Sequence, residues 1–246
     1  MKLYECVPKK YLEPIEQYNN DFDNWNKISI KECEEELVSL KSVNKKIILS
    51  PQYYINNIPG TENDCKVRKT IKDKLNKIAN KLPNEFNLLI WDAYRTIETQ
   101  NALFNKYYME FKKSTKLEGD NLLIYTKKFV SLASIDRQKP SPHNTGAALD
   151  LTICNSFGEP INLGVDFDEF SQNSYTRYYE EKLENGVILS PKETEILLNR
   201  RVLCNMFKEE GFANYPYEIW HKSFWDQMAS EALKQAYAIY GGIEAK

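Results

Sequence analysis

The chain has 246 residues, enough to bury one good hydrophobic core, so a single domain spanning residues 1–246 is the simplest organisation. Its 33 Lys and Arg residues nearly balance 35 Asp and Glu residues, without the clustered excess of base that nucleic-acid surfaces carry. No apolar run approaches the length that spans a bilayer. We therefore expect neither a nucleic-acid partner nor a membrane partner.

The cysteines and the start of the chain indicate a reducing compartment. The stretch from Met1 to Pro14 carries charges and prolines and lacks the apolar region of a secretory signal. The five cysteines are scattered, and an odd count without a signal peptide favours free thiols in a cytoplasm. We expect these cysteines to pack as small core residues rather than to bind metal: Cys6, Cys33, Cys65, Cys154 and Cys204.

The first half of the chain alternates helical and strand patterns. Ser29 to Glu32 resembles a capping box, and apolar residues recur at helical spacing after it. A second helical pattern begins at Val67 and stops near Pro83, and Thr96 can cap a third. Short apolar runs without helix breakers are typical of strands. The expected elements are helices near 30–41, 67–82, 97–113 and 120–132, and strands at 45–49 and 86–91.

Polar side chains follow directly on the apolar run at 86–91. Asp92, Tyr94 and Arg95 stand where this expected strand gives way to a loop. A rigid strand end is a good position for groups that do chemistry. The residues alone leave open the alternative that Arg95 is an ordinary exposed arginine.

The second half predicts two more strands and two more helices. Two prolines exclude a helix between Arg137 and Pro142. Ser190 begins another capping box, and Gly211 is a good helix stop. Residues 171–185 are polar and rich in tyrosine, and we expect a surface excursion there. The remaining elements are strands at 147–153 and 218–221 and helices at 190–211 and about 224–240. Helices mixed with a few separated strands predict an α+β fold.

The two histidines of the chain both stand near acidic residues. His143 precedes Asp150, and His221 follows Glu218. Imidazole and carboxylate groups are good zinc ligands, and three of them with one open position make a catalytic site. Glu218 could then take the proton from a water on the metal. The spacing differs from His-Glu-x-x-His, so the ligands would come from distant segments, and two unrelated histidines remain the alternative.

Several short runs occur in a characteristic order between about Pro51 and about Trp225. The most informative are SPHNTGAALDLT at 141–152 and EIWH at 218–221. Others are WDAYR at 91–95, DFDEF at 166–170, NRR at 199–201 and GFANYP at 211–216. Together they resemble the zinc D-alanyl-D-alanine dipeptidases of peptidase family M15, relatives of the DD-carboxypeptidases and of the Hedgehog signalling domain. The resemblance implies the Hedgehog/DD-peptidase fold, in which a central antiparallel sheet carries the zinc and helices flank it.

The resemblance also implies a catalytic set. Glu218 would be the general base and later the acid that protonates the leaving amine. Arg95 would stabilise the oxyanion. One zinc ion per chain would be bound by His143, Asp150 and His221.

Two further residues match family positions that hold the ends of a dipeptide. Ser141 would lie near the substrate carboxylate and Asp168 near its ammonium group. The alternative for Asp168 is that it caps a following helix, since Asp is a good N-cap. Trp220 and Tyr94 are expected to pack rather than to contact the substrate.

The chain departs from the family pattern at two places. It has Ile219-Trp220-His221-Lys222 where the family has Trp-Trp-His-Phe, and residues 1–50 match poorly. A family tyrosine that helps to bind the substrate carboxylate finds no clear counterpart. These departures leave the catalytic set whole but leave the substrate preference open.

The expected function is hydrolysis of the dipeptide D-Ala-D-Ala to two D-Ala, in cell-wall precursor turnover or in glycopeptide resistance. One alternative is a DD-carboxypeptidase or amidase that acts on longer peptidoglycan peptides, which the lack of a visible signal peptide argues against. Another is a non-catalytic binding module on the same fold, which the complete set of ligands and base argues against. The oligomeric state, including a homo-oligomer, stays open.

Overall fold

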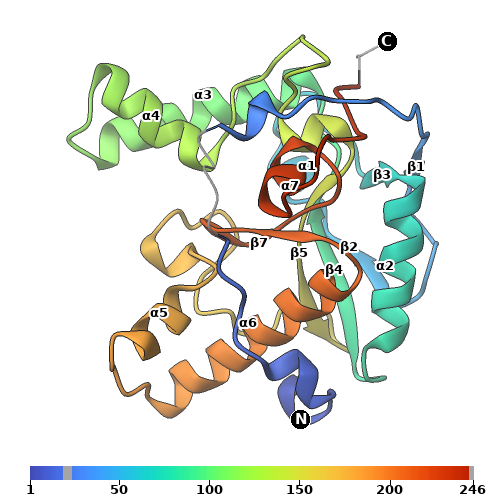
Figure 1. Cartoon of the computed structure of the whole chain (residues 1–246), viewed down its shortest axis with the longest axis vertical. Helices are drawn as coiled ribbons and strands as arrows, with labels where there is room; N and C mark the ends of the chain where they lie inside the picture. The colour runs from blue at the N-terminus through green and yellow to red at the C-terminus, as the bar shows by residue number, and fades with distance from the viewer. Residues whose placement is uncertain (19–23, 244–246) are drawn as a thin grey trace.

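A five-stranded sheet forms the centre of the molecule. The computed structural model describes residues 1–18 and 24–243, and the sheet has the strand order β2-β4-β5-β7-β6 (Figure 1). Neighbouring strands are antiparallel except for β2, which runs parallel to β4, so the expected antiparallel sheet is mixed at one edge. The strands are β2 (Ile47–Leu49), β4 (Phe86–Asp92), β5 (Ala148–Asn155), β6 (Ala213–Tyr215) and β7 (Glu218–Ser223). Helices and sheet together confirm the α+β class.

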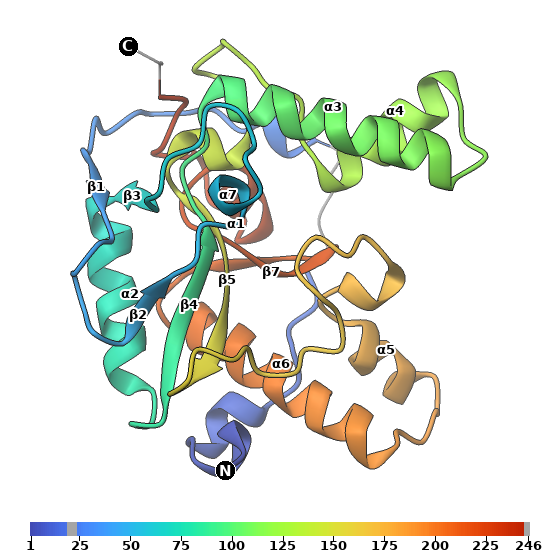
Figure 2. The same ribbon diagram turned by 180° about the vertical axis from the view of Figure 1, so that it is seen from behind.

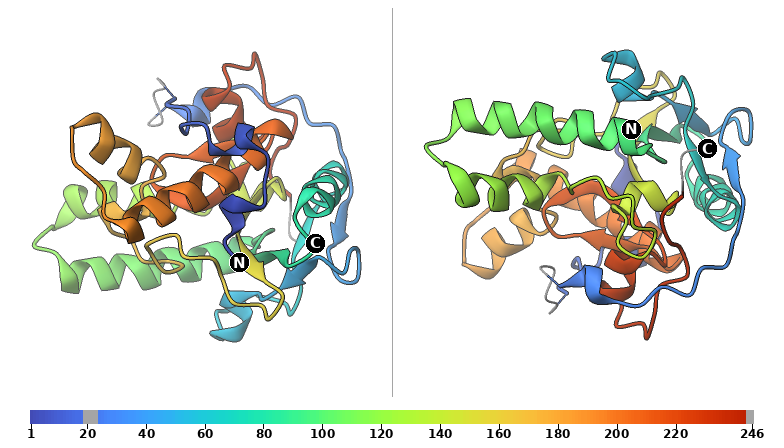
Figure 3. Two further views of the ribbon diagram at one scale, coloured as in Figure 1. Left: turned by 90° about the horizontal axis from the view of Figure 1, so that it is seen from below. Right: turned by 90° about the horizontal axis from the view of Figure 1, so that it is seen from above.

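Seven α-helices surround the sheet within the described residues. Figure 2 shows α2 and α6 near the sheet, whereas α3 and α4 form a helical hairpin that projects beyond it, as Figure 3 also shows. None of these helices combines the length and the apolar character needed to cross a membrane. Their bounds are α1 (Gln52–Ile55), α2 (Lys69–Lys81), α3 (Ile97–Ser114), α4 (Gly119–Phe129), α5 (Tyr178–Glu184), α6 (Pro191–Glu209) and α7 (Gln227–Ala232).

The alternation of side chains along β5 separates the core from the functional face. Leu149, Leu151 and Ile153 are fully buried and belong to the main hydrophobic cluster, together with residues of α2, α6 and β4. Each such side chain removed from water stabilises the fold by roughly 1.5–3 kcal/mol. Because successive strand residues point to opposite faces, Asp150 points away from this cluster. Asp150 therefore lies on the face of the sheet opposite α2 and α6.

The expected helix at 30–41 is wrong. Residues 31–36 are irregular, and β1 (Leu37–Ser39) then pairs with β3 (Lys66–Arg68) as a two-stranded ribbon. The extended path lets the Glu35 carboxylate accept a hydrogen bond from the Thr70 amide at the start of α2, at 2.7 Å. Long-range pairing therefore overrides the helical spacing of the apolar residues. Because Val67 belongs to β3, the second helix begins at Lys69 rather than at Val67.

Two expectations in the second half need correction. The C-terminal helix covers only α7, because Trp225 and Lys234 on either side of it have positive φ angles. The segment 171–185 is not a simple surface excursion, since it contains α5 with Tyr179 and Glu180 buried. Glu180 pairs with Arg201 of α6 at 2.7 Å, which ties α5 to the body of the molecule.

The other expected elements are confirmed. Ser190 and Glu193 form the predicted capping box at the start of α6. The Thr96 hydroxyl accepts a hydrogen bond from the Thr99 amide and caps α3. The strands at 45–49, 86–91, 147–153 and 218–221 and the helix at 120–132 all appear, with their ends shifted by up to three residues.

Candidate functional site

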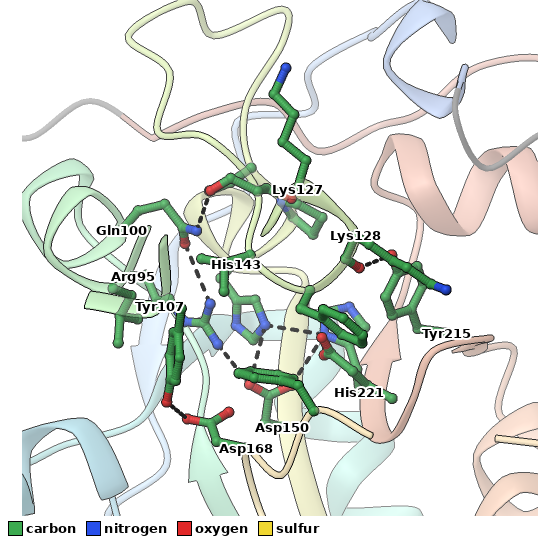
Figure 4. A pocket seen from close by; sticks show the side chains of 18 of the residues that line it. Arg95, Gln100, Tyr107, Lys127, Lys128, His143, Asp150, Asp168, Tyr215 and His221 are labelled. Carbon is green, nitrogen blue, oxygen red and sulfur yellow. Dashed lines mark hydrogen bonds and ion pairs between the residues drawn. The ribbon is translucent and has the colours of Figure 1, made fainter. Parts of the chain in front are cut away.

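Three segments far apart in the sequence bring two imidazoles and a carboxylate together. Asp150 on β5 lies directly opposite His221 on β7 in the strand pairing, and His143 lies in the short 3-10 helix η4 (Pro142–Thr145) that precedes β5. One ligand atom from each residue lies within 4.8 Å of the others. His221 Nδ1 is 3.1 Å from Asp150 Oδ1 and 3.2 Å from His143 Nε2 (Figure 4). The structure thus joins the three residues that the sequence suggested as ligands.

The turn η4 is built to deliver His143 to the edge of β5. Pro142 occupies its first position, and Gly146 ends it with a φ of 70°, a left-handed conformation that favours glycine. A Cβ atom at Gly146 would lie 2.4 Å from a methyl carbon of Leu37, so the ribbon strand β1 also requires glycine here. The backbone therefore holds His143 in one place before any ligand binds.

The outer ring nitrogen of each histidine has a partner. His143 Nδ1 donates to the carbonyl oxygen of Ala93 at 2.7 Å, and His221 Nε2 lies 3.0 Å from Ser223 Oγ. Such outer partners fix the tautomer and the ring orientation of histidines that bind metals. They leave His143 Nε2 and His221 Nδ1 facing Asp150.

The charges around the cluster show how a proton is held there. Burial and Arg95 lower the pKa of His143, but Asp150 and Asp92 outweigh them and raise it to about 9. Burial lowers the pKa of His221 to about 4. Although burial opposes it, His143, His221 and Arg95 hold the pKa of Asp150 well below its usual range. The cluster therefore carries its proton on His143, and a cation that binds the three side chains must displace that proton.

Glu218 begins β7 and lies beside the cluster. Its side chain is buried, its Oε2 is 4.0 Å from His221 Nδ1, and its Oε1 has no hydrogen-bond partner among the described residues. Burial, with Asp150 and Asp168 nearby, raises the pKa of Glu218 well above its usual range. A carboxyl group with an unpaired oxygen and a raised pKa is suited to accept and release a proton.

Arg95 is buried at the end of β4, so the alternative of an exposed arginine is wrong. Its Nε donates to Asp92 at 2.6 Å and its Nη2 donates to Asp150 at 2.7 Å. Asp92 also lies 3.1 Å from His143 Nδ1 and so contacts both the arginine and the histidine. Arg95 therefore brings a fixed positive charge to the edge of the cluster.

The two histidines, Asp150, Arg95 and Glu218 line one pocket, and Asp168 lines it too. Asp168 does not cap a helix. It has a φ of 60° in a turn, and its two carboxylate oxygens accept hydrogen bonds from Tyr53 at 3.2 Å and Tyr107 at 2.6 Å. Burial raises the pKa of Asp168 to about 6. Ser141 lines the pocket too, and its buried hydroxyl has no hydrogen-bond partner among the described residues.

Several pocket residues escape analysis of the sequence. Tyr53 on α1 and Tyr107 on α3 carry no local signal, because a tyrosine on the apolar side of a helix has the pattern of a core residue. Asp92 does not line the pocket itself, and its contact with His143 depends on the fold. Trp220 is buried against Phe167 and Phe170 outside the pocket lining, in keeping with the packing role expected for it.

Comparisons with known proteins identify the family. A sequence model of the peptidase M15 D-ala-D-ala dipeptidases matches residues 34–240, beginning before the Pro51 at which the resemblance was expected to start. A D-alanyl-D-alanine dipeptidase of Synechocystis sp. is 30% identical over 174 residues, which cover 65% of this chain and 70% of that protein.

Two solved structures are more distantly similar. One is a mutant of the vancomycin resistance D,D-pentapeptidase VanY from a VanB-type cassette in complex with Zn(II), with a TM-score of 0.42, 12% identity and coverage of 93% of this chain and 96% of that chain. The other is VanYB in complex with D-alanine-D-alanine, with a TM-score of 0.41, 13% identity and coverage of 93% and 94%. The extent of the family match and the identity to the Synechocystis protein decide the assignment: this chain is a peptidase of the M15 D-Ala-D-Ala dipeptidase family.

Proposed function

We propose that the protein is a zinc-dependent dipeptidase that hydrolyses D-Ala-D-Ala to two molecules of D-Ala. The observation that carries the proposal is one pocket with three convergent metal-ligand side chains, a buried carboxyl group with an unpaired oxygen, and a second carboxylate apart from them. Membership of the D-Ala-D-Ala dipeptidase family supports the choice of substrate.

The donor atoms of the cluster fit zinc. His143 and His221 present ring nitrogens and Asp150 presents carboxylate oxygens, a set of three protein ligands that is typical of catalytic rather than structural zinc. Two neutral imidazoles and one carboxylate would leave the site with a net charge of about +1. Zinc bound there supplies Lewis acidity, which polarises a carbonyl group and makes water a stronger acid.

Glu218 and Arg95 would supply the remaining chemistry. Glu218 takes the proton of the attacking water on its unpaired oxygen and then delivers it to the leaving amine. The raised pKa of Glu218 suits the second task, because it lets the carboxyl group hold the proton until the leaving amine takes it. Arg95 points its guanidinium into the pocket and stabilises the negative charge that develops on the carbonyl oxygen.

The two ends of the pocket would recognise the two charged ends of a free dipeptide. Asp168, held by two tyrosine hydroxyls, pairs with the ammonium group. The Ser141 hydroxyl donates to the carboxylate. We also propose a cytoplasmic location, which the free thiols favour, and a role in cell-wall precursor turnover or glycopeptide resistance.

A panel of peptides tests the proposal. The zinc-loaded protein should hydrolyse D-Ala-D-Ala, and a chelator should abolish the activity. N-acetyl-D-Ala-D-Ala should react at least about a hundredfold more slowly, because it leaves the Asp168 carboxylate unpaired. Asp168→Ala should impair hydrolysis of the free dipeptide and change that of the acetylated one little, whereas Asp166→Ala, at an exposed position nearby, should affect neither. Equal kcat/KM for both peptides on the unmutated protein would instead identify a carboxypeptidase.

A further inference from the structure

One short segment separates the catalytic pocket from a larger surface groove. Residues 127–131, at the end of α4 and just beyond it, line the pocket, and three of them also line the groove. We call these residues the roof segment. Figure 4 shows Lys127 and Lys128 beside the histidines, with the Lys127 side chain pointing away from them. The groove has a volume of about 970 Å³, and its wall also includes Tyr217 and Pro140.

The catalytic pocket is narrow beneath the roof segment. The free space in the catalytic pocket is about 30 Å³. A water molecule needs roughly 10–15 Å³ measured in this way, so the pocket has room for about two or three waters and not for a dipeptide. The groove lies on the other side of the roof segment, so outward movement of the segment would join the two spaces.

Contacts at both ends hold the roof segment in place. On the α3 side, Gln100 Nε2 donates to the carbonyl oxygen of Ser131 at 2.7 Å. On the β6 side, the Tyr215 hydroxyl donates to the carbonyl oxygen of Lys128 at 2.7 Å. The Lys128 ammonium donates to the Tyr175 hydroxyl and lies 4.6 Å and 4.1 Å from the ring centres of Tyr175 and Tyr217.

Lys128 is the side chain of the roof segment that makes these contacts. Its ammonium is enclosed by two half-buried aromatic rings, which attract a cation through their negative faces. Tyr175 and Tyr217 both lie outside the strands and α-helices, in loops next to the short 3-10 helix η5 (Gln172–Ser174) and the strand β6. These contacts of Lys128 tie the helical hairpin to the two loops, and we call this set of contacts the latch.

The groove adjoins the segment that carries Ser141, the residue proposed to bind the substrate carboxylate. Asp168 and its partners Tyr53 and Tyr107 line the pocket but not the groove. Pro140, which precedes Ser141 in the chain, lines the groove. With the ammonium group of the substrate at Asp168 and its carboxylate at Ser141, residues added after the second alanine would extend towards the roof segment.

We propose that Lys128 is a specificity-determining residue that restricts the enzyme to dipeptides by closing the carboxylate end of the pocket. This proposal rests on the proposed function. When the latch is released, the groove accepts the C-terminal extension of peptides that keep a free N-terminus, such as D-Ala-D-Ala-D-Ala. Peptides blocked at the N-terminus gain nothing, because Asp168 lies at the other end.

Substitutions at Lys128 test the latch in two independent ways. Lys128→Met keeps the apolar stem but removes the ammonium, whereas Lys128→Arg keeps the cation over the rings. Lys113→Met, at an exposed position on α3, removes the same charge without touching the roof segment and serves as the control. Hydrogen–deuterium exchange of peptides covering 119–135 should be faster in Lys128→Met and close to the unmutated rate in Lys128→Arg and Lys113→Met.

The second measurement is the ratio of kcat/KM for D-Ala-D-Ala-D-Ala to that for D-Ala-D-Ala. Lys128→Met should raise this ratio about tenfold, because the free energy of a cation–π contact corresponds to roughly a factor of ten. The kcat/KM for N-acetyl-D-Ala-D-Ala should not rise. An unchanged ratio would overturn the proposal, as would equal gains for the acetylated peptide. Exchange needs no turnover, so unchanged exchange in Lys128→Met refutes the latch even if D-Ala-D-Ala proves not to be a substrate. A failure of D-Ala-D-Ala hydrolysis in the unmutated protein refutes the proposed function separately.

Discussion

Glu218 combines three properties that seldom occur together by chance in a carboxyl group. It is buried, one of its oxygens has no partner among the described residues, and two other carboxylates raise its pKa. Leaving a buried polar oxygen unpaired destabilises the folded protein, which makes functional use of the group the better explanation. The three side chains proposed as metal ligands differ in this respect, because each has a hydrogen-bond partner in place.

The Glu218→Gln substitution should separate the base from the ligands. Glutamine keeps the size of the side chain but cannot accept the proton, so activity should fall by more than the roughly 10²–10⁴-fold of a general acid–base group, because the group acts twice. The zinc content should stay at one ion per chain, since Glu218 is not a ligand. Elemental analysis and steady-state kinetics measure the two effects, with Glu98→Gln at an exposed position of α3 as the control. Near-normal turnover would show that the base is misassigned.

Replacing Ser223 should weaken zinc binding and leave proton transfer by Glu218 unchanged. Its hydroxyl is the partner of His221 Nε2 at 3.0 Å, so Ser223→Ala frees the imidazole to change its tautomer and orientation. We expect zinc affinity to fall by about 10–100-fold, the usual effect of losing such a partner. Competition with a chromophoric chelator measures the affinity. Activity should return at saturating zinc, and an unchanged affinity would contradict the role of Ser223.

At the scale of elements, the site depends on how η4, β5 and β7 meet. The pairing of β5 with β7 sets Asp150 opposite His221, and a shift by one residue would move Asp150 to the other face of the sheet. The turn η4 lies outside the paired strands, so strand pairing does not fix the position of His143. Gly146 fixes it instead, because its amide donates to the carbonyl oxygen of His143 at 3.1 Å and closes the turn.

The Gly146→Ala substitution should therefore harm the site as well as the stability. A left-handed alanine costs roughly 1–2 kcal/mol, and the contact with Leu37 adds to this. Gly186 also has a positive φ, but a Cβ atom there would meet nothing within 4 Å, so Gly186→Ala is a matched control for backbone strain alone. Denaturant unfolding should show a larger loss for Gly146→Ala, and zinc affinity should fall only in that variant. Equal losses of stability in both variants would show that the Leu37 side chain moves aside at no cost in free energy.

At the scale of the whole molecule, a bound metal would join parts of the chain that are 78 residues apart, as His143 and His221 are. His143 lies in η4, just before β5, and His221 lies on β7, which pairs with β5. A ligand that binds the folded state alone shifts the unfolding equilibrium towards that state. Metal binding and global stability should therefore be linked.

Zinc should raise the free energy of unfolding by about 2.7 kcal/mol when free zinc is a hundredfold above its dissociation constant. His143→Ala and His221→Ala should each abolish this increase, because each removes one of three ligands. Thermal unfolding with and without added zinc measures the effect, and elemental analysis should find about one ion per chain. A full complement of metal in the double variant would rule out the proposed centre.

Local patterns in the sequence were enough for much of the fold. The strands that carry Asp150 and His221, the capping box at Ser190 and the cap at Thr96 all depend on residues close together in the chain. The ordered motifs likewise pointed to the candidate ligands and to Glu218. Local periodicity failed at 30–41, where β1 pairs with a strand about thirty residues away and gains more from that pairing than from a helix.

The contacts that enclose and support the pocket come from segments far apart in the sequence. The hydroxyls of Tyr53 and Tyr107 reach Asp168 across separations of 115 and 61 residues, and no local spacing encodes such contacts. The same holds for Lys128, which is an unremarkable lysine in the sequence and becomes a latch when the helical hairpin meets Tyr175 and Tyr217. The residues that could do the chemistry can be recognised without a structure, because the types of side chain and their motifs are local. The tertiary structure determined which residues hold and enclose them, because those contacts form when distant segments pack together.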